Sequence, residues 1–176
     1  SQLAALTERA RAVLGAGAAL GNVFRSSPIA AALEMAPTDV LEALDEVLPS
    51  KLVARAGVGE YRFSYPLVRD ILDKGMPAAE AARLHGRLGR ALADAVTEGS
   101  SHVELGAVAR HFALAAAAGD GALAAEWAAK AAEAALAAGE PAAATEHAAR
   151  GEEALRHGAK VPPALRARLT KLARGR

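Results

Sequence analysis

The sequence has no cysteine, few aromatic residues and almost no net charge. A chain without cysteine can form neither a disulfide nor a thiolate metal site, so thiol chemistry is excluded. Phe, Tyr and Trp together make up 3% of the 176 residues, which argues against a protein built mainly from strands. The formal charge of +1 is too small to indicate a nucleic-acid surface by itself, so such a role needs local evidence.

Long apolar runs are missing as well. No uninterrupted run reaches the roughly 18 residues that a membrane-spanning helix needs, because charges or glycines interrupt each stretch. No basic leader precedes a small-residue cleavage site either. We therefore expect a soluble, cytoplasmic protein. Because the sequence begins with Ser1 instead of Met and enters a helical pattern almost at once, we also expect it to be part of a longer chain.

Alanine is the residue that the sequence has in abundance, at 49 of 176 positions. Alanine is the best helix former, and 52% hydrophobic residues are enough for a buried core, so the predicted fold class is mainly α. The composition is mixed up to Met76 and becomes a succession of alanine-rich helices from Pro77. This change predicts two domains, residues 1–76 and residues 77–176.

The first two helices of the first domain follow from apolar spacing and helix-start residues. Helical spacing of apolar residues predicts a first helix over residues 3–14, which we expect to weaken after Gly15 because further glycines follow. Phe24 is expected to fill the core. Ser27 is predicted to cap a second helix, with Pro28 at its first position.

The rest of the first domain is predicted to contain a third helix, a hairpin and a closing helix. Thr38 or Asp39 is expected to cap the third helix, which ends before Pro49. Alternating apolar residues and helix signals then give the remaining elements: strands at 51–56 and 61–65, a turn at 57–60, and a helix at 67–74 that Pro66 opens. Three helices, a hairpin and a closing helix indicate a winged-helix domain.

The second domain is predicted to be an array of five helices, similar to tetratricopeptide (TPR) repeats. Residues 119–130 align without gaps on residues 139–150, so each repeat unit is one helix and its turn. Small residues fall on one face of both helices and predict close packing between them: Ala124, Ala128 and Ala131, then Ala144, Ala148 and Gly151. Residues 160–176 contain six basic residues and no acid, and form either a basic cap or the point where a longer array is cut.

Motifs for chemistry are weak in this sequence. Residues 15–21 are rich in glycine, but a helix precedes them where a dinucleotide loop needs a strand, and no phosphate-binding GxxxxGK[ST] loop is present. We expect Trp127 to pack between helices. The five histidines have neither zinc-helix spacing nor a paired nucleophile, and we expect them to have surface or packing roles: His85, His102, His111, His147 and His157. We predict no catalytic residue and no metal site.

A DNA-binding role depends on the third helix, which a helix-turn-helix protein places in the major groove. The charged residues of that helix are all acidic: Asp39, Glu42, Asp45 and Glu46. Phosphates would repel this helix, whereas DNA readers use Arg or Lys, so we expect no DNA reading through it. Three basic residues of the hairpin leave wing contacts as an exception: Lys51, Arg55 and Arg62.

Several strings in the sequence carry a family resemblance: YRFSYPLVRD at 61–70, ARLH at 82–85, ARHF at 109–112 and AGD at 118–120. These strings resemble the winged-helix and helical-repeat modules of bacterial STAND signal-transduction ATPases, found in large LuxR-type regulators, AfsR-like activators and ATPase-linked kinases or cyclases. The resemblance extends from Thr7 to Leu155. It implies a nucleotide-binding module before the winged helix, with ATP or ADP bound there and no cofactor in this chain.

Tyr65 departs from the family pattern. The family usually has a histidine at this position, where it resembles the residue that reads bound ADP in related switch ATPases. A phenol can hydrogen-bond a phosphate but cannot carry the positive charge of an imidazole, so the departure favours a structural role over a cofactor contact. The adjacent Pro66 is a second departure and is expected to stiffen the junction between strand and helix.

The sequence therefore favours a non-catalytic regulatory segment of a STAND-type ATPase. In this interpretation the segment relays signals between a nucleotide-binding module outside the chain and a protein partner or small-molecule inducer on the helical arm. The alternative is a DNA-binding winged-helix transcription factor whose helical half dimerises or senses a ligand. We expect no enzymatic activity in the chain itself.

Overall fold

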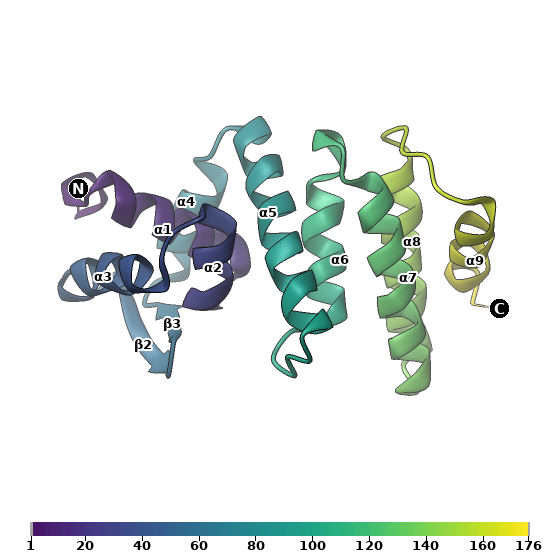
Figure 1. Cartoon of the computed structure of the whole chain (residues 1–176), viewed down its shortest axis with the longest axis horizontal. Coiled ribbons are helices and arrows are strands. Elements are labelled where there is room, and N and C mark those ends of the chain that lie inside the picture. Colours follow the sequence, from purple (N-terminus) through teal and green to yellow (C-terminus); the bar gives the residue numbers. More distant parts are fainter. Residues whose placement is uncertain (1, 176) are drawn as a thin grey trace. The chain divides into compact units, whose positions relative to one another are not determined.

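The computed structural model describes residues 2–175 and is mainly helical, with a small antiparallel sheet near the N-terminus (Figure 1). The chain divides into two units, Ser1–Ala91 and Leu92–Arg176, and the division falls inside helix α5 (Ala78–Thr97). The change in composition at Met76 and Pro77 lies just before the same helix. Over residues 2–175, the helices are too short or too polar to cross a membrane.

Unit 1 alternates helices with three short strands. The bounds of its elements before α5 are α1 (Glu8–Leu20), β1 (Val23–Arg25), α2 (Ser26–Leu33), α3 (Pro37–Val47), β2 (Val53–Gly57), β3 (Glu60–Phe63) and α4 (Pro66–Lys74), with single 3-10 turns at Gln2–Ala5 and Leu48–Ser50. The strands form one antiparallel sheet in the order β1-β3-β2. The predicted hairpin is therefore confirmed as β2 and β3, and Pro66 opens α4 as expected.

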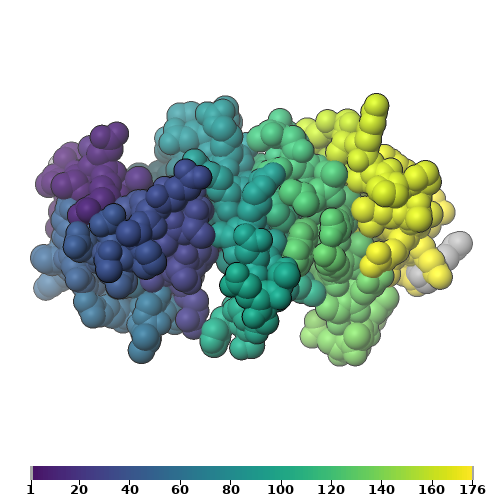
Figure 2. Space-filling view, in the orientation of Figure 1, coloured from purple at the N-terminus to yellow at the C-terminus, as the bar shows by residue number. Residues whose placement is uncertain are grey.

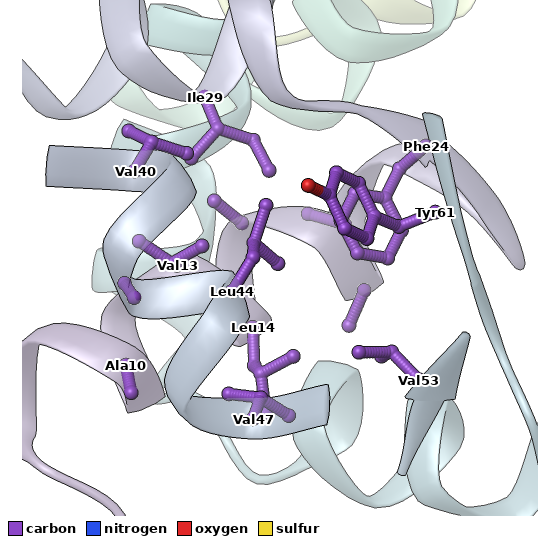
Figure 3. Packing of buried hydrophobic residues seen from close by; sticks show 14 of the residues in the cluster. Ala10, Val13, Leu14, Phe24, Ile29, Val40, Leu44, Val47, Val53 and Tyr61 are labelled. Carbon is purple, nitrogen blue, oxygen red and sulfur yellow. The ribbon is translucent and has the colours of Figure 1, made fainter. Parts of the chain in front are cut away.

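Three aromatic side chains from the sheet fill the core of unit 1 against α1 and α3 (Figure 3). The ring centroid of Phe24 lies 5.3 Å from that of Phe63 and 6.0 Å from that of Tyr61, and all three side chains are buried. A Cβ on Gly17 would lie 2.9 Å from Phe24 Cζ, so α1 needs a glycine where the ring crosses it. The predicted weakening of α1 after Gly15 is wrong, because this close packing stabilises the helix through to Leu20.

Strand β1 was not predicted, and because of it α2 begins earlier in the sequence than predicted. Its three residues pair with β3, and the backbone N–H of Ser26 then donates to Gly59 O at 3.0 Å. Helix α2 consequently begins at Ser26 with Arg25 as its N-cap, so the predicted cap at Ser27 is wrong and Pro28 occupies the third helical position. A proline is tolerated there because the first four N–H groups of a helix have no intrahelical partner.

Helix α3 also begins earlier than predicted. Its N-cap is Ala36 and Pro37 is its first residue, so neither Thr38 nor Asp39 is the cap. Proline has a φ suited to the first helical position and lacks only an N–H that the helix would leave unpaired.

Unit 2 continues from the last residues of α5 with four further helices. Their bounds are α6 (Leu105–Leu114), α7 (Gly121–Ala137), α8 (Pro141–Leu155) and α9 (Pro163–Ala173), with a 3-10 turn at Ala116–Ala118. With α5 included, the described part of the chain holds the five helices predicted after Pro77. Short connections make α6, α7 and α8 successively antiparallel, so α6 and α8 run in the same direction (Figure 1).

Helices α7 and α8 pack through the small residues that the repeat predicted. All six are buried: Ala124, Ala128, Ala131, Ala144, Ala148 and Gly151. A Cβ on Gly151 would lie 2.7 Å from the Cβ of Ala128 and 3.0 Å from Leu169 Cδ2. The two helices therefore approach closely where Gly151 faces Ala128.

The repeat also appears in the surface ion pairs of the two helices. Lys130 Nζ lies 2.8 Å from Glu126 Oε1 on α7, and Arg150 Nη2 lies 2.8 Å from Glu146 Oε1 on α8. Both pairs are four residues apart, and they occupy equivalent positions of the repeat, whose offset is 20 residues.

Helix α9 closes the array against α7 and α8, as the yellow segment of Figure 2 shows. It buries Leu169 and Leu172, and the guanidinium of Arg168 forms a two-pronged ion pair with Glu133 of α7. Thr170 Oγ1 donates to Glu152 of α8 at 2.6 Å. The basic C-terminal stretch thus includes a docked helix, while its last residue, Arg176, lies outside the described residues.

The close approach of α7 and α8 predicts the effect of Gly151→Ala. The added methyl group has no room beside Ala128, and overpacking of this kind costs about 1–3 kcal/mol, which exceeds the gain of about 1 kcal/mol from replacing a helical glycine. We expect a lower free energy of unfolding in denaturant titrations followed by the fluorescence of Trp127, the single tryptophan of the chain.

Gly15→Ala is the matched control for this variant. The added Cβ would meet only Met76 Cε at 3.5 Å, an ordinary contact, so helicity followed by circular dichroism should become more resistant to denaturant. Equal stabilisation by both substitutions would contradict the close packing of α7 on α8.

Candidate functional site

The candidate residues for catalysis and cofactor binding lie apart from one another. His85 and His111 are buried, His102 and His157 are exposed, and His147 is half-buried on α8. Over residues 2–175, no three His, Asp or Glu side chains come together as a metal site would require. The glycine-rich residues 15–21 form the end of α1 and its C-cap, so they do not form a phosphate-binding loop.

Trp127 is 7% exposed and fills space inside unit 2, as predicted. The ammonium group of Lys130 lies 4.3 Å from the centroid of its ring, which adds a cation–π contact at the surface. The indole is therefore a packing residue, and it does not line the groove described below.

The acidic face of α3 is held by ion pairs within unit 1. Arg9 on α1 lies 3.9 Å from an oxygen of Asp39 and 3.5 Å from one of Glu42. Arg55 on β2 lies 2.7 Å from Asp45. All these side chains are about half exposed, so the ion pairs contribute little to stability. The pair with Asp45 does, however, engage Arg55, one of the three basic hairpin residues that could make a wing contact.

Glu46, the fourth acid of α3, binds the start of α1. Its carboxylate accepts hydrogen bonds from the backbone N–H and from the hydroxyl group of Thr7, both at 2.8 Å. The Thr7 hydroxyl also caps α1 by accepting from the N–H of Ala10. The backbone hydrogen bond from Thr7, then the hydroxyl hydrogen bond, and to a smaller extent the charge of Arg9, lower the pKa of Glu46 below its usual 4.5.

This contact predicts a pH-dependent effect of Glu46→Gln. Because the pKa is lowered in the folded state, the carboxylate stabilises unit 1 above pH 4.5, and this stabilisation is lost as the pH falls through the folded-state pKa. We expect the variant to be less stable than the wild type at pH 7 and the difference to shrink towards pH 3, measured by thermal unfolding. A difference that stays constant over this range would contradict the charged contact.

Helix α4 presents an exposed apolar face. Tyr65 at its N-cap is 60% exposed, Leu67 is 68% exposed and Ile71 is 54% exposed. The opposite side of the helix is anchored by Arg69, whose Nε donates to the carbonyl of Ala18 on α1 at 3.0 Å. The string that carries the family resemblance therefore ends on a surface where large apolar side chains lie open to solvent.

Unit 2 has a groove on its surface, which we call the α6–α8 groove. It has a volume of about 520 Å³ and is open on one side. Three alanines of α7, at positions 131, 134 and 135, line it together with Ala138, the C-cap of that helix, and Gly106 and His147 are in contact there. Leu105 and Ala107 of α6 also line the groove, and its charged residues are the N-caps of α6 and α8 and one arginine from each helix: Glu104, Glu140, Arg110 and Arg150.

His147 is in close contact with α6. A Cβ on Gly106 would lie 2.7 Å from the Cε1 atom of the imidazole ring, so α6 needs a glycine opposite the ring. The Nδ1 atom of His147 is buried without a hydrogen-bond partner, and it is the one such side-chain atom among residues 2–175. A buried polar atom without a partner costs about 1–3 kcal/mol, so this contact is maintained against a penalty.

The α6–α8 groove was not predicted from the sequence. The spacing of the histidines predicted only a surface or packing role for His147, and no pattern gave a role to the glutamates at the starts of α6 and α8. The sequence signal that could have drawn attention to His147 was the repeat, because Trp127 and His147 occupy equivalent positions and their side chains differ in size.

Comparisons with known proteins give no identification. No protein-family model, no curated protein and no solved structure matches the chain.

Proposed function

We propose that the chain is a non-catalytic regulatory segment of a STAND-type signalling or transcription-regulating ATPase. Unit 1 would pack on a nucleotide-binding module outside this chain, and unit 2 would receive a signal. The observation that carries the proposal is the combination of a winged-helix element order with a third helix whose exposed charges are all negative.

The element order of unit 1 supports the winged-helix assignment. A winged helix has one helix, a short strand, two helices and a hairpin, and the strand before the second helix pairs with the last strand of the hairpin. Elements α1 to β3 follow this order, and the sheet order β1-β3-β2 places the first strand beside the last. The antiparallel helices of unit 2 likewise support a TPR-like arm.

The exposed face of α4 supports a protein partner for unit 1. Contiguous apolar side chains on the surface of a protein commonly mark an interaction site, and Leu67 and Ile71 are one helical turn apart. Helix α5 contributes residues to both units, so the two are joined by a continuous helix. We therefore expect nucleotide-dependent changes in the neighbouring module to reach unit 2 through unit 1.

A DNA-binding transcription factor is the second candidate, and the hairpin favours it. Lys51 and Arg62 are exposed and have no ion-pair partner among residues 2–175. Wing residues of this kind contact phosphates in some DNA-binding proteins. Two cations beside an acidic α3 supply few of the phosphate contacts on which non-specific affinity depends, which is why this candidate ranks second.

Titration with labelled duplex DNA at low salt separates the two candidates. We expect no saturable binding, because phosphates are repelled by the acidic face of α3. Tight binding that weakens steeply as salt is added would overturn the first proposal. Loss of such binding in a Lys51→Gln, Arg62→Gln double variant would then establish wing contacts and the transcription-factor alternative.

The double variant Leu67→Ser, Ile71→Ser tests the packing of unit 1 on an ATPase module. The parent gene should encode a nucleotide-binding module with a GxxxxGK[ST] loop upstream of Ser1, and that module, co-expressed with this chain, should copurify with it. We expect the variant to keep its thermal stability, because both side chains are exposed, and to lose copurification.

Val58→Ser is the matched control, since Val58 at the hairpin turn is 99% exposed and is not part of α4. It should leave copurification unchanged. An upstream sequence without a phosphate-binding loop would contradict the family assignment.

A further inference from the structure

Helix α4 is the least buried of the helices α1 to α4. None of its nine residues, all of which the structure describes, is buried, whereas α1 has eight buried residues, α2 three and α3 four. Segments with few buried apolar contacts open at a lower free energy than the core of the same protein. The burial of unit 1 therefore favours local opening at α4 over local opening at α1, α2 or α3.

The apolar face of α4 is divided between the core and the solvent. At about 100° per residue, four apolar residues lie side by side around the helix over about 140°: Leu67, Ile71, Val68 and Leu72. Val68 and Leu72 pack partly buried against the core of unit 1, while Leu67 and Ile71 are exposed. A surface helix normally turns the whole of its apolar stripe towards the core. Unit 1 therefore holds α4 through only part of this stripe.

Two contacts attach α4 and the residues after it to α1. Arg69 Nε donates to the carbonyl oxygen of Ala18 at 3.0 Å, and Met76 Cε lies 3.5 Å from where a Cβ on Gly15 would be. Ala18 belongs to the last turn of α1, where carbonyl groups lack a partner within the helix and are bound by side chains or by water. Water satisfies this carbonyl when the guanidinium group leaves, so α1 does not have to unfold when α4 opens.

The residues that flank α4 are anchored and have short junctions with it. Phe63 at the end of β3 is 2% exposed, and Leu84 of α5 is 3% exposed. Helix α4 ends at Lys74, and Gly75 and Pro77 then interrupt the helical path before α5. Opening of α4 therefore needs changes of backbone angles at two short junctions and leaves both anchors in place.

We infer that residues 65–76, which we call the α4 strap, open from unit 1 as one unit while α1, α3 and the sheet stay folded. The inference deepens the proposed function, because the exposed residues Leu67 and Ile71 belong to this strap. A module that binds unit 1 with the strap closed stabilises the closed state, and its departure allows opening. The inference rests on the proposed function only for this control, since opening itself depends on unit 1 alone.

Native-state hydrogen exchange of the full chain, followed residue by residue by NMR in low concentrations of urea, tests the inference. We expect the amides of residues 70–75 to share one opening free energy, lower than that of the amides in α1 and α3. Their exchange should depend weakly on urea, because opening of the strap exposes little surface compared with unfolding of unit 1. The same free energy and urea dependence in all three helices would overturn the inference, and so would protection that changes gradually along α4, which indicates fraying.

Leu72→Ala and Ile71→Ala compare the two sides of the apolar stripe. The residues are adjacent in the sequence, and alanine preserves the helix propensity of α4. Leu72→Ala removes apolar surface that packs on unit 1, so exchange of residues 70–75 should accelerate about tenfold. Ile71→Ala is the matched control: Ile71 is 54% exposed, so the acceleration should be about threefold at most. Equal acceleration by both substitutions would overturn the inference.

Val47→Ala tests whether the strap opens independently of the core. Val47 is fully buried on α3, so its truncation should accelerate exchange in α1 and α3 about tenfold. Exchange of residues 70–75 should stay the same, because α3 remains folded when the strap is open. Leu72→Ala should instead accelerate exchange in all three helices, since its contacts are lost both in the open state and on unfolding.

Equal acceleration of α3 and α4 by Val47→Ala would mean that the strap opens only when unit 1 unfolds, and would overturn the inference. Ile29→Val is a smaller change in the same core and gives the same comparison if Val47→Ala does not fold.

Exchange in the complex with the co-expressed upstream module separates this inference from the proposed function. Slower exchange of residues 70–75 in that complex than in the chain alone supports both. Opening of the strap in the chain alone, together with a failure to copurify with the module, supports the strap and contradicts the proposed function. A complex that forms although α4 opens only with the rest of unit 1 supports the proposed function and overturns the inference.

Discussion

The close approach of α7 and α8 is the constraint on which unit 2 depends. Each alanine methyl group buries little area, and burial of apolar area contributes roughly 25 cal/mol per Å². The helices must therefore be near enough for backbone atoms to contribute to packing. Gly151 marks a point of close approach, where even one methyl group has no room beside Ala128. Ala131 belongs both to this packed face and to the α6–α8 groove, and the groove's other α7 residues, Ala134 and Ala135, are alanines as well, so the groove face of α7 also lacks large side chains.

Unit 1 fills its core with aromatic rings instead. Phe24, Tyr61 and Phe63 are half of the six aromatic residues of the chain, and all three lie on its small sheet. Since the aromatic side chains of the sheet fill the core, α1 can have a glycine where it faces the sheet and still be a stable helix. The acidic face of α3 lies outside this core, and Arg9 and Arg55 form ion pairs with three of its four acids, Asp39, Glu42 and Asp45. Two cations leave the face with a net negative charge, which favours a protein-contacting role for unit 1 over a DNA-contacting one.

The sequence predicted those elements whose signals are local. Pro66 opens α4, the alternation around residues 57–60 gives the hairpin, and the repeat gives the face shared by α7 and α8. Strand β1 escaped prediction because three residues carry no periodic signal and its pairing depends on β3. The early start of α2 has the same origin, since the bond from Ser26 to Gly59 joins residues 33 positions apart.

The groove could not be predicted for a related reason: its lining comes from three helices whose relative register is set by packing. Gly106 and His147 are in contact where α6 meets α8, and no local pattern contains both residues. Once that register is known, the placement of the glutamates and arginines follows from helix geometry alone.

Position 147 is where the repeat stops being symmetric. Its counterpart, Trp127, is buried on α7, and an indole at position 147 would need more room than the imidazole, which already lies 2.7 Å from where a Cβ on Gly106 would be. A smaller ring at this position therefore lets α6 approach α8. That approach leaves Nδ1 of His147 without a partner, a cost that packing between α6 and α8 must offset. The two repeat units thus differ where α8 meets α6.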